Sequence, residues 1–392
     1  MNKNKHALLS ASGAARWLEC TPSARLEEQI PKTQNAYADE GTFAHEVCEL
    51  SARYWLGEIN EPTYENALDE KRKGQYYNTE MLECAVNYGR FISENLKAIQ
   101  INCPDAFAEL EVKNLDFSAW APGGFGTGDC IIVADDLLEI IDFKYGKGVR
   151  VEADNNPQMR LYALGAINRY GDLYDIKRTR MTIIQPRINN DPSTEEISLD
   201  ELLDWAENYV KPRAELAIAG DGNFNPSVET CKFCRAKERC RARAEMNLAL
   251  FDESPDSLLI TPDEAGEILA KADDIKSWLS DLEKLVMQSL FEGKPVEGWK
   301  LVEGKSNRKF VDNLKVAEAM KEAGYEEALL YERSLITLTA MEKSFGKKAV
   351  GEILKDLIYK PQGKPTLATV KDKREAFTPE SLILEAFNEQ ED

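Results

Sequence analysis

A β-hairpin followed by a helix is the feature that most constrains how this chain folds. Two apolar, β-branched segments, residues 126–134 and 137–143, flank the turn signal Asp135-Asp136. This pattern predicts two antiparallel strands joined by a two-residue loop. Pro157 then suits the first turn of a helix. We therefore expect an α/β fold organised around this unit.

The register of the hairpin places two carboxylates opposite each other. Counting back from the loop pairs Asp129 with Asp142, and directly opposed residues have Cβ atoms about 4.5–5.5 Å apart. Like charges destabilise such a pairing unless a cation lies between them, and a hard divalent cation is the usual one. Lys144 leaves the same strand face two residues later. Solvated charges on an exposed strand are the alternative interpretation.

The helix after the hairpin adds two polar side chains. Gln158 and Tyr162 are four residues apart, so they share one helix face. Together these motifs resemble motifs II, III and IV of the RecB-like branch of PD-(D/E)XK nucleases, and a histidine segment upstream is similar to motif I. The motifs are Gly126-x-Gly-Asp129, Ile141-Asp142-Phe143-Lys144, Gln158-x-x-x-Tyr162 and Gly41-Thr42-Phe43-Ala44-His45.

The resemblance implies a PD-(D/E)XK core, a mixed central sheet flanked by helices, and a metal centre within it. In that centre His45, Asp129 and Asp142 hold Mg²⁺ or Mn²⁺, aided by the backbone carbonyl of Phe143. His45 is one of only two histidines in the chain. A lone histidine is more often a structural residue than a ligand, but the motif favours ligation through a neutral ring nitrogen.

The resemblance also assigns roles around the metal. Lys144 is expected to orient the attacking water or to stabilise charge on the phosphate. Gln158 and Tyr162 are expected to position Lys144 or the phosphate. Thr42 should cap the helix that carries the histidine, and Glu49 on that helix is a supporting residue.

Three clustered cysteines form a second candidate site. Cys231, Cys234 and Cys240 have the spacing C-x2-C-x5-C. In a cytoplasmic chain such crowding indicates a metal rather than a disulfide. Thiolates suit either zinc or an iron–sulfur cluster.

The fourth ligand is suggested by resemblance. In one branch of RecB-like nucleases, including AddB-type helicase-nucleases and CRISPR adaptation nucleases, one cysteine before motif I joins three after motif IV around a 4Fe–4S cluster. Cys20 has that position here, so the cluster would staple the two ends of the nuclease domain together. The other cysteines have no partner spacing and should be small buried apolar residues. They are Cys48, Cys84, Cys103 and Cys130.

Basic residues surround the cysteine trio. We interpret them either as a solvated helix face or as a rim that contacts the DNA backbone. They are Lys232, Arg235, Lys237, Arg239, Arg241 and Arg243. The formal net charge of −20 argues against non-specific nucleic-acid binding through bulk electrostatics, but it leaves room for a local basic groove.

Length and composition set the domain organisation. A chain of 392 residues is long enough for two domains. We expect a nuclease domain over residues 1–250 and a mostly helical α+β domain of unknown role over 258–392. The sequence has no apolar run long enough to span a membrane and no signal-peptide pattern, so we expect a soluble, cytoplasmic protein.

The remaining segments are predicted from caps and periodicity. We expect helices over about 10–22, 42–56, 61–100, 157–169, 198–219, 261–291, 311–324 and 334–359, with interruptions at Gly346 and Gly351. Further strands are expected over 106–113, 178–186 and 298–303, a loop over 23–40, and an extended basic segment over 363–374. Glu109 or Glu111 could face the metal site or be ordinary surface charges. Tail residues Lys300, Lys305, Arg308, Lys309, Lys371, Lys373 and Arg374 could contact DNA or be solvated.

These features predict a metal-dependent DNA nuclease, an exonuclease of phage-type recombination, replication or repair. The whole layout also resembles uncharacterised phage and prophage proteins. Its partners would be single-stranded DNA or duplex ends, together with phage recombination or single-strand-binding proteins. Two alternatives stay open: a catalytically inactive DNA-binding or scaffold protein of the same fold, and a zinc-stapled interaction protein.

Overall fold

The computed structural model describes residues 7–31, 36–189, 191–249, 261–302, 313–323, 330, 337–354 and 357. The chain divides into two compact units, residues 1–297 and 298–392. This division comes after the helix at 262–291, whereas we expected it near residue 252.

The first unit is built on one five-stranded sheet with strand order β1-β2-β3-β4-β5. The strands are β1 (Phe107–Asp116), β2 (Phe125–Val133), β3 (Leu137–Phe143), β4 (Arg178–Ile184) and β5 (Ser193–Ser198). The β3–β4 pair is parallel and the other pairs are antiparallel. The chain is therefore a mixed α/β protein, and the four predicted strands in this unit are confirmed, whereas β5 was not predicted.

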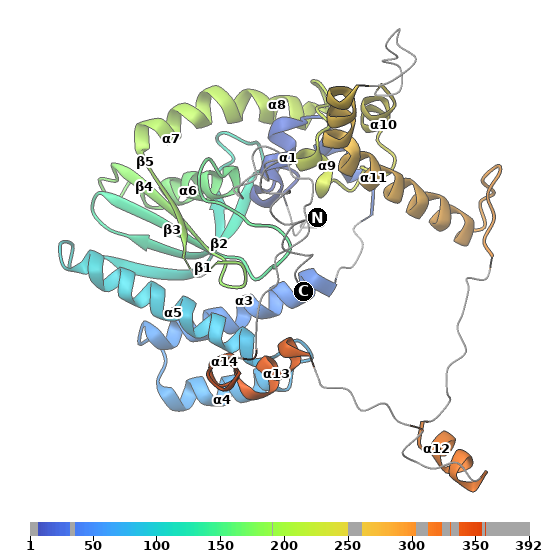
Figure 1. Ribbon diagram of the computed structural model, residues 1–392. Coiled ribbons are helices and arrows are strands. Elements are labelled where there is room, and N and C mark those ends of the chain that lie inside the picture. The colour runs from blue at the N-terminus through green and yellow to red at the C-terminus, as the bar shows by residue number, and fades with distance from the viewer. Residues whose placement is uncertain are drawn as a thin grey trace. The chain divides into compact units, whose positions relative to one another are not determined.

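Helices cover both faces of the sheet (Figure 1). On one face α3 (Ala36–Trp55), α4 (Glu61–Arg72) and α5 (Thr79–Gln100) pack on a core that includes Cys130, Ile132 and Phe143. On the other face α1 (Ala14–Glu19), α6 (Pro157–Tyr170), α7 (Leu199–Trp205), the π-helical turn Ala206–Val210 and α8 (Lys211–Ala219) pack on a core that includes Ile131 and Val133. Strands buried on both faces explain the nearly continuous apolar runs of β2 and β3.

The predicted hairpin register is confirmed. Cys130 pairs with Ile141 and Val133 with Leu138, and the amide of Ala134 donates to the carbonyl of Leu137 across the two-residue loop. Extending this register by one residue brings Asp129 beside Asp142. Both carboxylates therefore lie at the end of the hairpin away from its loop.

Asparagine caps fix where the helices near the site begin. Asn156 accepts hydrogen bonds from the amides of Gln158 and Met159, with Pro157 in the first turn of α6. Asn78 likewise accepts from the amide of Met81 at the start of α5. These caps satisfy backbone donors that the helix leaves unpaired.

Hydrogen bonds join the two ends of the first unit. The Thr21 hydroxyl donates to the carbonyl of Asp221 at 2.7 Å, and the Arg25 guanidinium donates to that of Ile218 at 2.7 Å. The residues after Cys20 are thereby held beside the end of α8. Of the cysteine trio, Cys231 lies on α9 (Val228–Lys232), Cys234 in the following turn and Cys240 directly before α10 (Arg241–Leu248).

A long helix, α11 (Pro262–Phe291), completes this unit. Thr261 and Glu264 form the predicted capping box at its start. α11 packs against α10, where Arg243 and Asp281 form an ion pair of 2.7 Å. This pair explains why α11 belongs with residues 1–297 rather than with the tail.

Three local predictions were wrong. The segment expected to be a loop contains α2 (Ser23–Glu28), which begins directly after Pro22. α3 begins before Thr42, whose hydroxyl donates back to the carbonyl of Ala38 instead of capping. Within the described part of 298–303 no strand is assigned.

The second unit contains α12 (Asn313–Glu322), α13 (Leu338–Phe345) and α14 (Lys347–Ile353). Gly346 separates the last two with a φ of 87°, as predicted, but Gly351 lies inside α14. Lys305, Arg308, Lys309 and the segment 363–374 lie outside the described residues. None of the helices in the described ranges is long and apolar enough to cross a membrane.

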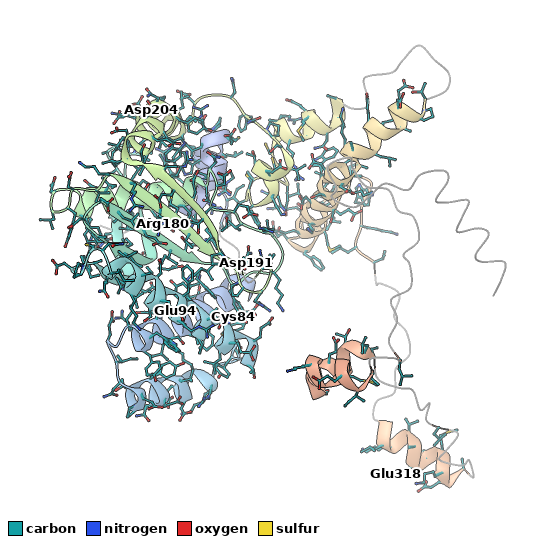
Figure 2. The ribbon with its side chains drawn as sticks, turned by 60° about the vertical axis from the view of Figure 1, so that its left-hand side comes forward. Cys84, Glu94, Arg180, Asp191, Asp204 and Glu318 are labelled. Atoms are coloured by element: carbon teal, nitrogen blue, oxygen red, sulfur yellow. The ribbon has the colours of Figure 1, made fainter. Side chains whose placement is uncertain are left out.

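Polar pairs also line the sheet away from the hairpin end. Figure 2 shows Arg180 on the sheet, and Cys84 and Glu94 on the helical layer that covers one face. Arg180 pairs with Glu196 at 2.8 Å and lies 3.5 Å from the buried carboxylate of Glu139. Glu139 also accepts hydrogen bonds from Asn95 and Thr182, so this buried acid is satisfied by structural partners.

Candidate metal centre

The end of the hairpin collects polar groups from five elements. α3 supplies His45, β1 supplies Glu111, β2 supplies Asp129, β3 supplies Asp142 and α6 supplies Gln158. Three of these elements are neighbouring strands, so their acidic residues form a row across the sheet. The α6 cap places its first helical turn beside the end of that row.

Three ligand-type atoms meet within the row. His45, Glu111 and Asp129 bring one nitrogen and two carboxylate oxygens to within 4.8 Å of one another, and all three side chains are partly buried. The Nδ1 atom of His45 lies 3.2 Å from Oδ1 of Asp129. The His45 ring also packs edge-on against Phe143, which fixes its orientation.

A backbone irregularity brings Glu111 into this group. Its φ is 51°, in the left-handed region that non-glycine residues rarely adopt. Leu110 packs in the core on the α3 face, whereas Val112, two residues later, packs in the core on the α6 face. Regular alternation would keep both on one face. Strain of this kind is characteristic of functional sites.

Asp142 faces Lys144 rather than the group of three. Its Oδ2 atom lies 2.9 Å from Nζ of Lys144, but among the described residues it accepts no well-aligned hydrogen bond. Burial raises the pKa of Asp142, and the positive charge of Lys144 only partly opposes this, while Asp129 adds to it. Asp142 thus offers a buried, incompletely satisfied oxygen at the end of the row.

Lys144 is held in its charged form. Burial alone would lower the pKa of its ammonium, but the Asp142 carboxylate outweighs that effect and raises it. The ammonium also donates to Oε1 of Gln158 at 3.3 Å. Lys144 is therefore a cation beside the site whose direction is set by two neighbours.

Gln158 connects the charged pair to Tyr162. Its Nε2 atom lies 3.2 Å from the Tyr162 hydroxyl and 3.5 Å from Oδ1 of Asp142. Gly126 makes room for this arrangement, because a Cβ atom there would lie 2.5 Å from the Tyr162 ring. The glycine in the motif is thus required by close approach of the aromatic ring.

The charges of the row act on one another. Burial lowers the pKa of His45, but its contact with Asp129 and the charge of Asp142 raise it above the ordinary value overall. Burial, with the negative charges of Asp129 and Glu49, raises the pKa of Glu111. Negative charge is therefore in excess on the side of the row that holds the three ligand-type atoms.

The other residues predicted near the metal differ in whether they reach the centre. Phe143 contacts the site through its amide, which donates to Oδ2 of Asp129 at 2.8 Å, and its carbonyl stays a predicted ligand. Glu49 pairs with Arg53 at 2.7 Å. Glu109 pairs with Arg169 and accepts from the Tyr170 hydroxyl, so of the two strand glutamates only Glu111 reaches the centre.

The four predicted cluster cysteines border one small cavity. Cys20, Cys231, Cys234 and Cys240 all line it. Burial raises the pKa of the Cys20 thiol, while the nearby backbone of Asn225 and Ser23 partly opposes that rise. Of Cys48, Cys84, Cys103 and Cys130, all but Cys103 are buried, as expected for small apolar residues.

The sulfur atoms in this cavity are not closely packed. Among the described residues, only the His45 group brings three ligand atoms within 4.8 Å of one another, so no three of these sulfurs are that close. Burial raises the pKa of the Cys234 thiol to about 11, and the nearby backbone of Ala236 partly opposes that rise. The cavity is therefore bordered by four thiols, and the nearby backbone lowers the pKa of three of them, Cys20, Cys231 and Cys234, against the effect of burial.

The predicted basic rim separates into two kinds of residue. Lys232, Arg239 and Arg241 are exposed. The other three make internal contacts. Arg235 donates to the carbonyl of Ile30, and Lys237 and Arg243 both pair with Asp281. Arg243 is only 3% exposed, so its role in this structure is to hold α11 on α10.

Sequence reasoning missed two contributors to these sites and left a third undecided. Glu111 was one of two equal candidates, because nothing in the alternating pattern signals a positive φ. Glu27 accepts from Arg16 and from the amide of Arg235, and so connects the Cys20 segment to the trio. Asp281 lies beyond the expected domain boundary, where a pairing with Arg243 has no local signal.

Comparisons with known proteins give a family but no activity. A solved structure described as the crystal structure of SSO0001 matches 58% of this chain and 95% of its own chain at 20% sequence identity, with a TM-score of 0.23. At that TM-score the likeness carries no argument. A family model described as a protein of unknown function, DUF2800, matches residues 6–375. Because that match spans most of the chain, the protein belongs to the DUF2800 family.

Proposed function

We propose that this protein is a divalent-metal-dependent DNA nuclease with a RecB-like PD-(D/E)XK core. The observation that carries the proposal is the acidic row Glu111, Asp129 and Asp142, with His45 at one end and Lys144 at the other. Metal-dependent phosphodiester hydrolysis requires ligands for a cation and, beside them, a positively charged group held in position.

The donor set fits a hard divalent cation. Glu111, Asp129 and His45 would hold it, and the excess negative charge around Glu111 favours a positive ion there. Carboxylate oxygens are the ligands that Mg²⁺ and Mn²⁺ prefer. Asp142, whose Oδ2 atom is buried without an aligned donor, is the proposed further ligand. When bound, the cation activates water and neutralises charge on the scissile phosphate.

The protein's own groups prepare the site for that chemistry. The Phe143 amide donates to Asp129 and fixes its carboxylate. Lys144, charged and directed by Asp142 and Gln158, is the group that stabilises negative charge on the phosphate. Tyr162 holds the Gln158 amide from its other side. Each of these positions is set before substrate arrives, as efficient electrostatic stabilisation requires.

The cysteine cavity is the proposed site of a 4Fe–4S cluster that staples the domain ends. Tetrahedral zinc with Zn–S bonds of about 2.3 Å needs sulfurs about 3.8 Å apart, closer than any three in this cavity. A larger iron–sulfur cluster needs wider spacing, and amide donors to sulfur are typical of its surroundings. Zinc is the alternative occupant in a given preparation.

The substrate proposed is DNA, as single strands or duplex ends cleaved by an exonuclease of phage-type recombination, replication or repair. Lys232, Arg239 and Arg241 supply exposed positive charge near the cysteines for backbone contacts. Phage recombination and single-strand-binding proteins are the proposed partners. With a formal net charge of −20, binding should depend on such local charges and weaken with salt.

The test is digestion of end-labelled single- and double-stranded DNA by anaerobically purified protein. Wild type should cleave with Mg²⁺ or Mn²⁺ and not with EDTA, and Asp129→Asn should be inactive but folded. Asp136→Asn, a change in the exposed hairpin loop, is the matched control and should cleave normally. DNA binding without cleavage would favour the inactive scaffold, and a colourless protein with stoichiometric zinc would favour the zinc-stapled alternative for the cysteines.

A further inference from the structure

The Ser23 hydroxyl is an unexplained polar group in the cysteine cavity. Ser23 is 2% exposed, lines the cavity with the four cysteines, and its Oγ atom has no hydrogen-bond partner among the residues described. A buried hydroxyl without a partner destabilises the folded state. Such groups in native proteins call for a specific partner.

The surroundings of Ser23 restrict what that partner can be. Its backbone amide already donates to the carbonyl of Cys20 at 2.9 Å, so only the hydroxyl is left without a partner. The two cations that line the cavity are Arg16 and Lys237, and both are donors. The side-chain acceptors that line this cavity with Ser23 are the four sulfurs and the Thr230 hydroxyl, which already accepts from Ser227 at 3.0 Å.

The cations are themselves held in place. Arg16 pairs with Glu27 at 2.8 Å and Lys237 lies 3.4 Å from Asp281. Both acids are buried, so the positions of the cations are fixed from behind. The two charged side chains that line the cavity are thus both positive, which suits an occupant rich in negative sulfur.

We infer that Ser23 donates its hydroxyl hydrogen to a sulfur of the bound cluster and thereby raises the cluster's reduction potential. The inference rests on the iron–sulfur site of the proposed function. Reduction by one electron adds one negative charge to the cluster while no protein bond forms or breaks. A hydrogen bond to sulfur is stronger in the more negative state, so it stabilises the reduced cluster. Ser23 is a positioning and tuning residue, not a ligand.

The test is a redox titration of anaerobically purified full-length protein, with dithionite as reductant and the cluster followed by EPR. Ser23→Ala should keep its iron and sulfide but reduce at a more negative potential. A tenfold change in the ratio of reduced to oxidised cluster corresponds to about 59 mV for one electron. Ser23→Thr keeps a hydroxyl and should stay near wild type. Ser12→Ala changes an exposed serine and is the matched control.

The outcomes separate this inference from the site on which it rests. Full iron with an unchanged potential in Ser23→Ala overturns the role of Ser23 alone. Wild-type protein without iron overturns the cluster and this inference together. If Ser23→Ala loses iron, Ser23→Gly provides a second hydroxyl-free variant, and its potential must again be the more negative one.

Discussion

The buried ion pair between Arg243 and Asp281 makes a quantitative prediction about how α11 is held. Their side chains are 3% and 2% exposed and the pair distance is 2.7 Å. Asp281 also lies 3.4 Å from Lys237, in the segment between Cys234 and Cys240. One carboxylate therefore fixes both α10 and part of the cysteine segment.

Asp281→Asn removes the charge while keeping the shape. Among the described residues, the change leaves Arg243 buried with Asp274 at 3.7 Å as its remaining acidic partner, and its Nε atom already has no partner there. Losing one partner of a buried pair costs about 3–5 kcal/mol. Because Asp274 remains, we expect the lower end, about 3 kcal/mol.

Urea unfolding of Asp281→Asn beside Asp273→Asn measures this effect. Asp273 lies on the same helix with a side chain 97% exposed, so its substitution should change the free energy of unfolding by less than about 0.5 kcal/mol. The double variant Arg243→Met with Asp281→Leu should recover most of the loss, because replacing both charges by apolar groups is often neutral. If Asp281→Asn and Asp273→Asn were equally stable, the role of Asp281 in holding α11 on α10 would be refuted.

The same pair sets a pH dependence. Burial raises the pKa of Asp281, but Arg243 and Lys237 more than offset this and lower it below its ordinary value. A group whose folded pKa is depressed contributes stability above its unfolded pKa, about 3.9, and loses it as pH falls through the folded pKa. The gap between wild type and Asp281→Asn should therefore be constant near neutrality and shrink below about pH 4.

Three further changes test other parts of the account. Lys144→Ala should slow DNA cleavage by orders of magnitude while Mn²⁺ affinity stays near wild type, because the lysine is not a ligand; Lys147→Ala is the control, and an unchanged rate would assign the role to another group. Gly126→Ala places a Cβ 2.5 Å from the Tyr162 ring, so it should lower the free energy of unfolding by about 1–3 kcal/mol and reduce activity. Gly146→Ala is the control and should do neither, because Gly146 has open space around it. Similar melting curves for the two variants would argue against the close approach. Cys20→Ala should lose iron, colour and thermal stability together, while Cys48→Ala keeps its iron; full iron in the first variant would mean that another residue is the fourth ligand.

The hairpin and its helix were predictable because their signals are local. A two-residue loop leaves only one register for the flanking apolar strands, so the pairing that brings Asp129 beside Asp142 follows from the sequence. Asn156 and Pro157 likewise define the start of α6 through its unpaired amides. At the hairpin and at the start of α6, residue propensity, the apolar pattern and the helix cap all predict the same structure.

The remaining features depend on distant contacts. Glu111 reaches the centre through a left-handed conformation that propensity argues against. The basic stretch around Arg243 predicts a charge on the surface. In the structure Arg243 is buried instead, because it pairs with Asp281, 38 residues later in the sequence. The Ser23–Glu28 helix lies in a segment that the sequence predicts as a loop. It is held in place by Arg25, which donates to the carbonyl of Ile218. Tertiary contacts of this kind override local preference.

The measurement that tests the central claim most directly is the cleavage rate of end-labelled DNA as Mn²⁺ is titrated into wild type, Glu111→Gln and Glu109→Gln. Glu111 is within 4.8 Å of the other ligand atoms, whereas Glu109 is occupied by Arg169. If the acidic row is a nuclease metal centre, Glu111→Gln should need at least about tenfold more Mn²⁺ for half-maximal rate, and Glu109→Gln should follow the wild-type curve. No cleavage by wild type at any Mn²⁺ concentration, or identical curves for all three proteins, would contradict the account.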